Sequence, residues 1–124
     1  ELKLKYNEED FLPIFYDFDK SNVLSKYKER LDKIVSILNE NINLNLEVSS
    51  YADCRGTKKY NLKLSKSRNN SVMEYLKKHI KFPERINGNG LGEINNSLNS
   101  NCNCCNISED VHQLNRRTEF KLIN

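Results

Sequence analysis

A carboxylate and a guanidinium flank the start of a predicted helix in the segment YADCRGTKKYNLKLSKSR, residues 51–68. Asp53 lies three residues before Gly56, and Arg68 ends the basic run that follows that glycine. A carboxylate binds an ammonium group, and a planar guanidinium grips a carboxylate through two parallel hydrogen bonds. The two side chains together would therefore suit a zwitterion, meaning an amino-acid-like group. The spacing alone favours the simpler alternative, in which Asp53 and Arg68 pair with each other as a structural ion pair.

The residues between these charges indicate how the two would come together. One face of the second predicted helix carries Asn61, Leu64, Ser65, Arg68 and Val72. Asn61 and Arg68 are two turns apart, which is roughly 10 Å along the helix axis. Because helical side chains lean toward the N-terminus, Arg68 can reach back toward the first turn, where backbone N–H groups add positive charge. Asp53 would lie just ahead of that turn, so we expect a small polar pocket with one negative and one positive pole.

Hydrophobic periodicity divides the rest of the chain into alternating strands and helices. The predicted strands are 11–19, with Pro13 at a sheet edge, 44–52, a short run within 84–93 that ends in a glycine-rich bend, and 116–123. The predicted helices are 25–41, capped by Ser25, and a second one from about residue 58 that Pro83 stops. Residues 94–110 are predicted to form a polar loop. The expected fold class is α/β: a two-layer sandwich, βαβαββ, with a mixed sheet covered on one face by two helices.

The composition narrows the classes of function. The chain has 124 residues, of which 37% are hydrophobic and 30% charged, and its net charge is +3. This length fits a single domain over residues 1–124, and the absence of an initiating Met or a signal-like start indicates a fragment of a longer protein. No apolar run approaches the ~20 residues that a membrane helix needs, so we expect no membrane insertion by this segment. Acids interleave with the cations, as in KYKERLDK, which is typical of solvated helix faces and not of a nucleic-acid-binding surface.

Catalytic patterns are weak in this sequence. Asp17 and Asp19 would share one strand face, but no nucleophile or acid partner accompanies them. The glycine-rich run NGNGLGE lacks the Lys-Ser/Thr of a phosphate loop and indicates a bend with close backbone approach. His79 and His112 have no Ser or Cys partner that the sequence identifies, and there is no Cys-x-x-Cys pair. We therefore expect a binding domain and not an enzyme.

An even number of cysteines suits disulfides in an oxidising compartment. The four are Cys54, Cys102, Cys104 and Cys105. A zinc site built from the CNCC run and His112 is the alternative, but Cys102-x-Cys104 is tighter than the usual zinc spacing. We prefer disulfides: one would staple the long loop, and Cys54 could reach a loop cysteine from the pocket rim. The sequence leaves all three complete pairings open.

Four blocks of the sequence resemble the successive signatures of one family. In chain order they are FYDFDKSNV, SSYADCRGTKKYNLKLSKSRNNSVMEYL, RINGNGLGE and NRRTEFKL. Together they resemble the OmpA-like, peptidoglycan-binding domain found at the C-termini of OmpA proteins, in Pal lipoproteins and in flagellar stator proteins. The resemblance runs from about Phe15 to Ile123 and keeps the family's order and approximate spacing.

This resemblance implies non-covalent binding of the cell-wall stem peptide at its meso-diaminopimelate residue, whose side-chain end carries an ammonium and a carboxylate. The implied ligand-binding residues are Asp19, Ala52, Asp53, Asn61, Leu64, Arg68 and Arg116. Asp53 would accept the ammonium, Arg68 would hold the carboxylate, and Asn61 would add an amide hydrogen bond. Asp19 would lie at the edge of the pocket, the two apolar residues would line it, and Arg116 would approach the peptide from the start of the last strand.

Two positions depart from the family pattern. The usual Gly-His-Thr/Ala-Asp is Ser50-Tyr51-Ala52-Asp53 here, which alters the packing behind the acid but keeps the acid in place. The usual Arg-Ala in the helix is Arg68-Asn69, a more polar pair for which we expect little effect on binding.

The resemblance also implies a periplasmic location, tethered to the outer membrane through the parent protein, with no cofactor. Other envelope proteins would be partners of the rest of that parent. Two alternatives stay open from the sequence: a metal site or enzyme built on the Cys/His loop, and a protein-interaction domain whose pocket has lost its ligand.

Overall fold

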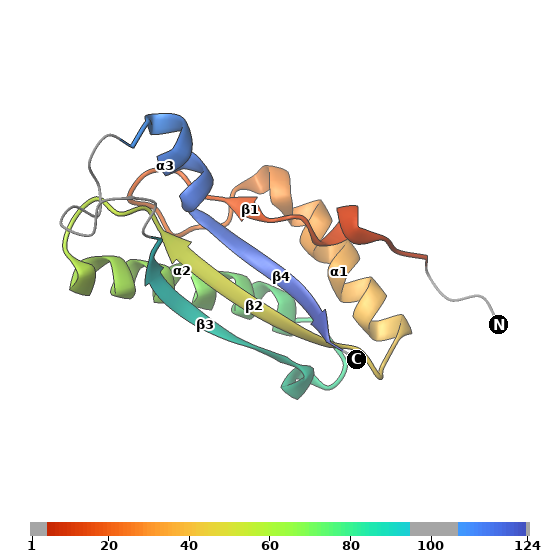
Figure 1. The fold of residues 1–124 in the computed structure, drawn as a ribbon. Helices are drawn as coiled ribbons and strands as arrows, with labels where there is room; N and C mark the ends of the chain where they lie inside the picture. Colours follow the sequence, from red (N-terminus) through yellow and green to blue (C-terminus); the bar gives the residue numbers. More distant parts are fainter. Residues whose placement is uncertain (1–4, 95–106, 124) are drawn as a thin grey trace.

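The structure, a computed structural model, describes residues 5–94 and 107–123 (Figure 1). Its sheet has four strands, β1 (Ile14–Phe15), β2 (Asn45–Ala52), β3 (Ile86–Glu93) and β4 (Arg117–Ile123). Their order is β1-β4-β2-β3; β2 runs parallel to β3, and β4 runs antiparallel to both of its neighbours. The predicted mixed sheet is therefore confirmed, and β1, next to Pro13, lies at its edge.

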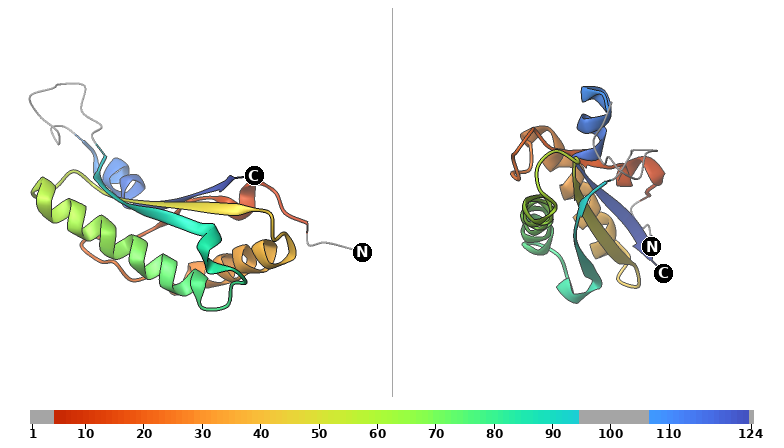
Figure 2. Two further views of the ribbon diagram at one scale, coloured as in Figure 1. Left: turned by 90° about the horizontal axis from the view of Figure 1, so that it is seen from below. Right: turned by 60° about the vertical axis from the view of Figure 1, so that its left-hand side comes forward.

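Two long helices, α1 (Lys28–Glu40) and α2 (Lys58–Lys77), cover the same face of the sheet, as Figure 2 shows. This arrangement confirms the predicted two-layer sandwich. The remaining helix, α3 (Glu109–Asn115), lies at the end of the sheet where β4 begins (Figure 1). Single 3₁₀ turns are η1 (Glu8–Phe11), η2 (Ser25–Tyr27) and η3 (Pro83–Arg85). In the part of the chain that the structure describes, no helix is long and apolar enough to cross a membrane.

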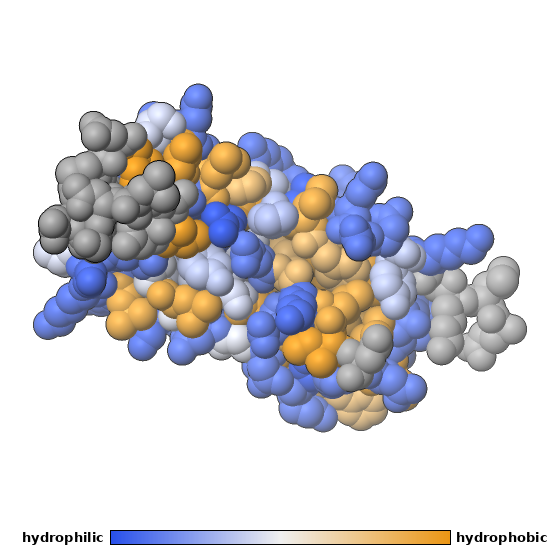
Figure 3. Space-filling view, in the orientation of Figure 1, coloured by the Kyte–Doolittle hydropathy of each residue, from blue (hydrophilic) through white to orange (hydrophobic). Residues whose placement is uncertain are grey.

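The hydrophobic core lies between the sheet and the two long helices. Strand β2 buries alternate residues, Leu46 and Val48 among them, as the period of two predicts. Helix α1 contributes a buried stripe that ends with Ile37 and Leu38, and α2 contributes Val72. Each such side chain stabilises the fold by roughly 1.5–3 kcal/mol relative to exposure. Figure 3 shows the opposite face of the sheet as a mixture of hydrophilic and apolar patches.

The first strand and the start of the first helix differ from prediction. Strand β1 has two residues instead of the predicted 11–19, because Pro13 carries no N–H and the chain after Tyr16 turns, with Lys20 N donating to Asp17 O at 3.1 Å. Ser25 is not a cap either: it begins η2, and α1 follows without a side-chain cap.

The end of α2 was also predicted wrongly. The helix stops at Lys77, and Pro83 opens η3 instead of ending α2. Asn39 of α1 provides the reason, because its side chain accepts from Lys81 N at 2.7 Å and donates to His79 O at 3.1 Å. These bonds satisfy backbone groups that a longer helix would have used.

The glycine-rich segment is a strand throughout and contains no terminal bend. Gly90 lies in β3 directly beneath α2, where a Cβ atom would be 2.2 Å from Lys66 N. The close approach of α2 to β3 therefore requires glycine at this position. The predicted close backbone approach is confirmed, whereas the predicted bend is wrong.

Residues 94–110 were predicted to form a loop, and the described end of that range is helical instead. Helix α3 begins after Ser108, whose hydroxyl accepts from Val111 N at 3.3 Å. Ser108 followed by two acids is a helix-start signal in the sequence, so α3 was detectable. The segment 95–106, with Cys102, Cys104 and Cys105, lies outside the described residues.

Candidate functional site

A pocket of about 130 Å³ opens where β2 ends and α2 begins. The residues that line it are Phe18, Asp19, Ala52, Asp53, Arg55, Gly56, Tyr60, Asn61, Leu64 and Arg68. Six of the seven residues predicted to bind ligand are among them, and the seventh, Arg116, contacts Asp53 from outside the lining. The fold therefore brings together residues that are up to about a hundred positions apart, because β4 pairs with both β1 and β2 in the sheet.

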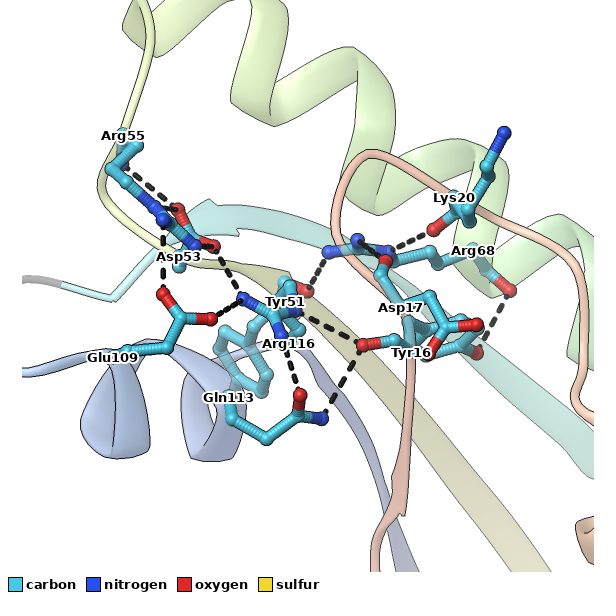
Figure 4. Close-up of polar contacts among 10 residues, drawn as sticks. All are labelled: Tyr16, Asp17, Lys20, Tyr51, Asp53, Arg55, Arg68, Glu109, Gln113 and Arg116. Carbon is cyan, nitrogen blue, oxygen red and sulfur yellow. Dashed lines mark hydrogen bonds and ion pairs between the residues drawn. The ribbon is translucent and has the colours of Figure 1, made fainter.

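Asp53 lies immediately after β2 and is 5% exposed. Its Oδ1 accepts from Arg55 N at 3.0 Å and from Arg55 Nε at 3.2 Å. Its Oδ2 accepts from Arg55 Nη2 at 2.9 Å and from Arg116 Nη1 at 3.3 Å (Figure 4). Burial pushes the pKa of Asp53 upward, but the hydrogen bonds and charge of Arg55 outweigh it, so the pKa lies below the usual range. These contacts therefore stabilise the charged form of the Asp53 carboxylate.

Arg68 is completely buried and points from α2 toward the end of β2. It donates to three backbone carbonyls: Lys20 O at 2.8 Å, Tyr51 O at 3.1 Å and Asp17 O at 3.3 Å (Figure 4). Its guanidinium also lies over the ring of Tyr16, 4.9 Å from the ring centroid. Burial lowers the pKa of Arg68.

The simple ion pair between Asp53 and Arg68 is therefore wrong. Among the described contacts, Asp53 is bound by Arg55 and Arg116, whereas Arg68 is bound by carbonyl oxygens. Two opposite charges thus line one pocket without neutralising each other directly, an arrangement that matches the two poles of a zwitterion.

Arg116 binds Asp53 from outside the lining of the pocket. It is 3% exposed, donates through Nε to Tyr16 O at 3.0 Å, and also contacts Gln113 of α3. Glu109, at the start of α3, lies 3.4 Å from Arg116 Nη1 and 3.1 Å from Arg55 Nη1. Arg116 is fixed by these contacts and binds the carboxylate of Asp53.

Asp19 lies on the rim of the pocket, as predicted, but not on a strand. Its backbone is left-handed, with φ of 60°, and its carboxylate accepts a hydrogen bond from the Tyr60 hydroxyl of α2. Asp17 lies in the preceding turn and contributes its backbone carbonyl to Arg68. The expected pair of carboxylates on one strand face is therefore wrong, because β1 ends before both residues.

Asn61 lies in the first turns of α2 and is 1% exposed. Thr57 caps this helix by accepting from Tyr60 N at 3.1 Å, so the first turn is held in place. The Nδ2 of Asn61 is buried in the pocket wall and has no hydrogen-bond partner in the described structure. A buried donor without a partner is costly, so this atom is suited to an acceptor supplied by a ligand.

Sequence reasoning missed several residues of the site, and three of them bear on its charged groups. Arg55 makes the most extensive contact with Asp53, Phe18 places its ring 4.5 Å from the Arg55 guanidinium carbon, and Glu109 bridges Arg55 to Arg116. The position of Arg55, two residues after the acid, was a usable signal, because Asp side chains commonly accept from the backbone two residues on. Glu109 carried no such local signal.

Cys54 follows Asp53 and is 4% exposed. The disulfide and zinc alternatives both depend on the three cysteines that lie outside the described residues. Within 5–94 and 107–123 no group of His, Cys, Asp and Glu side chains is arranged to hold a metal ion. His112 is buried in α3.

The sequence matches the OmpA family over residues 15–103. It is 35% identical over 63 residues to the peptidoglycan-associated lipoprotein of Buchnera aphidicola, covering 51% of this chain and 36% of that protein. It is 31% identical over 110 residues to outer membrane protein A of Bordetella avium, covering 88% of this chain and 53% of that protein. The chain thus spans about half or less of the length of these curated relatives.

The fold is shared with a solved structure as well. The crystal structure of the peptidoglycan-associated lipoprotein from Burkholderia pseudomallei superposes with a TM-score of 0.77 and 22% identity, covering 90% of this chain and 89% of that one. The family match covers more than half of the chain and includes every lining residue of the pocket. The chain therefore belongs to the OmpA family, and the resemblance seen in its sequence blocks is confirmed.

Proposed function

We propose that this domain binds peptidoglycan non-covalently, through the meso-diaminopimelate residue of the stem peptide, and anchors its parent protein to the cell wall. The observation that carries the proposal is that Asp53 and Arg68 line one pocket without pairing with each other. Relatives named peptidoglycan-associated lipoprotein support the same class of ligand.

The chemistry of the pocket suits the side-chain end of diaminopimelate. The carboxylate of Asp53 would bind the ammonium, since charge-assisted hydrogen bonds are the strong ones. A guanidinium carries five N–H donors, and Arg68 uses three of them on backbone carbonyls. The remaining donors would bind the carboxylate of the ligand. The unpartnered Nδ2 of Asn61 would donate to the same carboxylate. Ala52 and Leu64 would contact the aliphatic part of the ligand, and Asp19 would contact it at the rim.

We propose that the domain belongs to a longer envelope protein and acts in the periplasm, tethered to the outer membrane. Relatives named as an outer membrane protein and a lipoprotein, each longer than this chain, support this location. A disulfide between Cys54 and one of the loop cysteines is part of the same proposal, because disulfides persist in oxidising compartments.

Two types of peptidoglycan test the ligand directly. Lysine in a stem peptide has the side-chain ammonium of diaminopimelate but lacks the neighbouring carboxylate. Sacculi with diaminopimelate should retain the domain in a sedimentation assay, and sacculi with lysine should not, because Arg68 and Asn61 would then face no acceptor. Equal retention on both kinds would refute the assignment of the positive pole.

Substitutions test the negative pole. Asp53→Asn keeps the shape of the side chain and removes its charge, so binding of the tripeptide L-Ala-γ-D-Glu-meso-diaminopimelate should weaken at least 30-fold, or about 2 kcal/mol. Asp110→Asn is the matched control, because Asp110 is an exposed carboxylate of α3 outside the pocket. Calorimetric titration that gives the same affinity for both variants would refute the role of Asp53.

A further inference from the structure

The carboxylate proposed to bind a ligand ammonium is already occupied by a cation of the same chain. Arg55 covers both oxygens of Asp53 with its side chain, through Nε at 3.2 Å and Nη2 at 2.9 Å. With the Arg55 backbone N–H and Arg116 Nη1 added, each oxygen accepts two hydrogen bonds. A carboxylate offers about four acceptor sites in all, so no site on Asp53 is left for an ammonium.

The two arginines on Asp53 are held very differently. Arg116 has a side chain that is 4% exposed and is tied to the backbone oxygen of Tyr16. The side chain of Arg55 is 36% exposed, and its other partners are Glu109, itself 64% exposed, and the exposed ring of Phe18. Its contacts with Glu109 and Phe18 join exposed groups and are weak, so of the two arginines on Asp53 it is Arg55 that a ligand cation could displace.

Departure of the Arg55 side chain would leave the pocket intact. Asp53 would keep the Arg55 backbone N–H on Oδ1 and Arg116 on Oδ2. One acceptor site on each oxygen would open, both facing the pocket that Arg55 lines. Glu109 lies 3.1 Å from Nη1 of Arg55 and would remain as a partner for the displaced guanidinium.

We infer that Arg55 is a displaceable occupant of the cation subsite and that it sets both the affinity and the selectivity of the pocket. This inference rests on the proposed function. A ligand binds only if its cation replaces the guanidinium on Asp53, so neutral and weakly basic groups are excluded. The observed affinity is the intrinsic affinity multiplied by the fraction of molecules in which Arg55 has left.

Arg55→Ala tests this inference by the sign of its effect. If Arg55 competes with the ligand, the variant should bind L-Ala-γ-D-Glu-meso-diaminopimelate about 3- to 10-fold more tightly than the wild type, because no competitor must be displaced. If Arg55 were instead a contact for the ligand, the variant would bind more weakly. Calorimetric titration at one ionic strength distinguishes the two.

Arg117→Ala is the control, since it removes an arginine that pairs with a carboxylate outside the pocket, Glu119 at 2.8 Å. Arg117 does not line the pocket, so the Arg117→Ala variant should bind the tripeptide with the affinity of the wild type. Unchanged or weaker binding by Arg55→Ala, with binding by the wild type intact, overturns this inference alone. Absence of binding by both the wild type and Arg55→Ala overturns the proposed function and this inference together.

Methylguanidinium provides a second measurement that does not depend on the peptide. At millimolar concentration it should occupy the vacated subsite of Arg55→Ala and shift the backbone amide resonances around Asp53. The wild type, which carries its own guanidinium there, should respond only at several-fold higher concentration, and the double variant Arg55→Ala/Asp53→Asn should not respond. Equal responses from all three proteins would overturn the inference.

Discussion

The hydroxyl oxygen of Ser50 lies 2.8 Å from the side-chain amide of Asn69, inside the protein. These are two of the positions at which the sequence departs from the usual family pattern, which has Gly before the acid block and Ala after the helix arginine. Ser50 also contacts the Thr118 hydroxyl at 2.7 Å, and Thr118 contacts the Tyr16 hydroxyl at 2.6 Å. The two departures are therefore coupled through one buried polar cluster.

This coupling predicts non-additive effects on stability. Asn69→Ala should lower the free energy of unfolding by about 1–3 kcal/mol, because it removes a buried partner of Ser50. The double variant Ser50→Gly/Asn69→Ala should lose less than the sum of the two single variants. Urea denaturation of the four proteins measures the interaction energy, and strictly additive losses would contradict the coupling.

Tyr16 belongs to the same cluster, and its titration is dominated by burial. Burial raises the pKa of the Tyr16 hydroxyl to about 12, against the opposing hydrogen bond from Thr118 and the charge of Arg68. Tyr16 should therefore ionise only after the exposed tyrosines when the pH is raised. Ultraviolet absorption during alkaline titration measures this order, and Tyr16→Phe identifies the late component.

Acid should weaken the domain partly through Asp53. The pKa of Asp53 is lower in the folded chain than its usual value, because contacts with Arg55 and Arg116 outweigh burial. Its contribution to stability is therefore complete above the unfolded pKa of about 3.9 and is lost as the pH falls through the folded pKa. The difference in melting temperature between the wild type and Asp53→Asn should be largest near neutral pH and should shrink below about pH 4. A difference that stays constant into acid would contradict this assignment.

Arg68 should contribute to stability as well as to the proposed site. Arg68→Lys keeps the charge but loses the planar fork that reaches three carbonyl oxygens, so we expect a loss of about 1–3 kcal/mol in unfolding free energy. Arg117→Lys, at a partly exposed arginine, should cost less than about 0.5 kcal/mol. Thermal denaturation of both variants compares them; equal stability would mean that the buried contacts of Arg68 add nothing.

Cys54, the cysteine that lies within the described residues, gives a chemical test of the proposed disulfide. Cys54 should be linked to Cys102, Cys104 or Cys105 in protein prepared under oxidising conditions. Alkylation in denaturant without reductant, followed by peptide mass spectrometry, should show a cross-linked peptide that contains Cys54. Alkylation of all four cysteines under those conditions would contradict the disulfide.

Local pattern was sufficient for the main elements of this protein. The alternation in 44–52 predicted β2 to within one residue, and the helical stripe with Asn61 and Arg68 predicted one face of α2. Both succeed because side-chain period and burial are properties of consecutive residues. Elements whose ends depend on distant groups were predicted less well. The end of α2 is an example, because Asn39 of α1 binds the backbone that follows this helix. The position of α2 on the sheet also depends on Gly90 in β3.

The presence of Asp53 and Arg68 in one pocket followed from the sequence, but their partners did not. The sequence offered the two as a pair, whereas the fold assigns Asp53 to Arg55 and Arg116 and assigns Arg68 to backbone oxygens. Arg116 reaches Asp53 across 63 residues, because β4 runs beside β2 in the sheet. A charged group pairs with the opposite charge that is nearest in space and best fixed, and that distance exists only once strands and helices have packed.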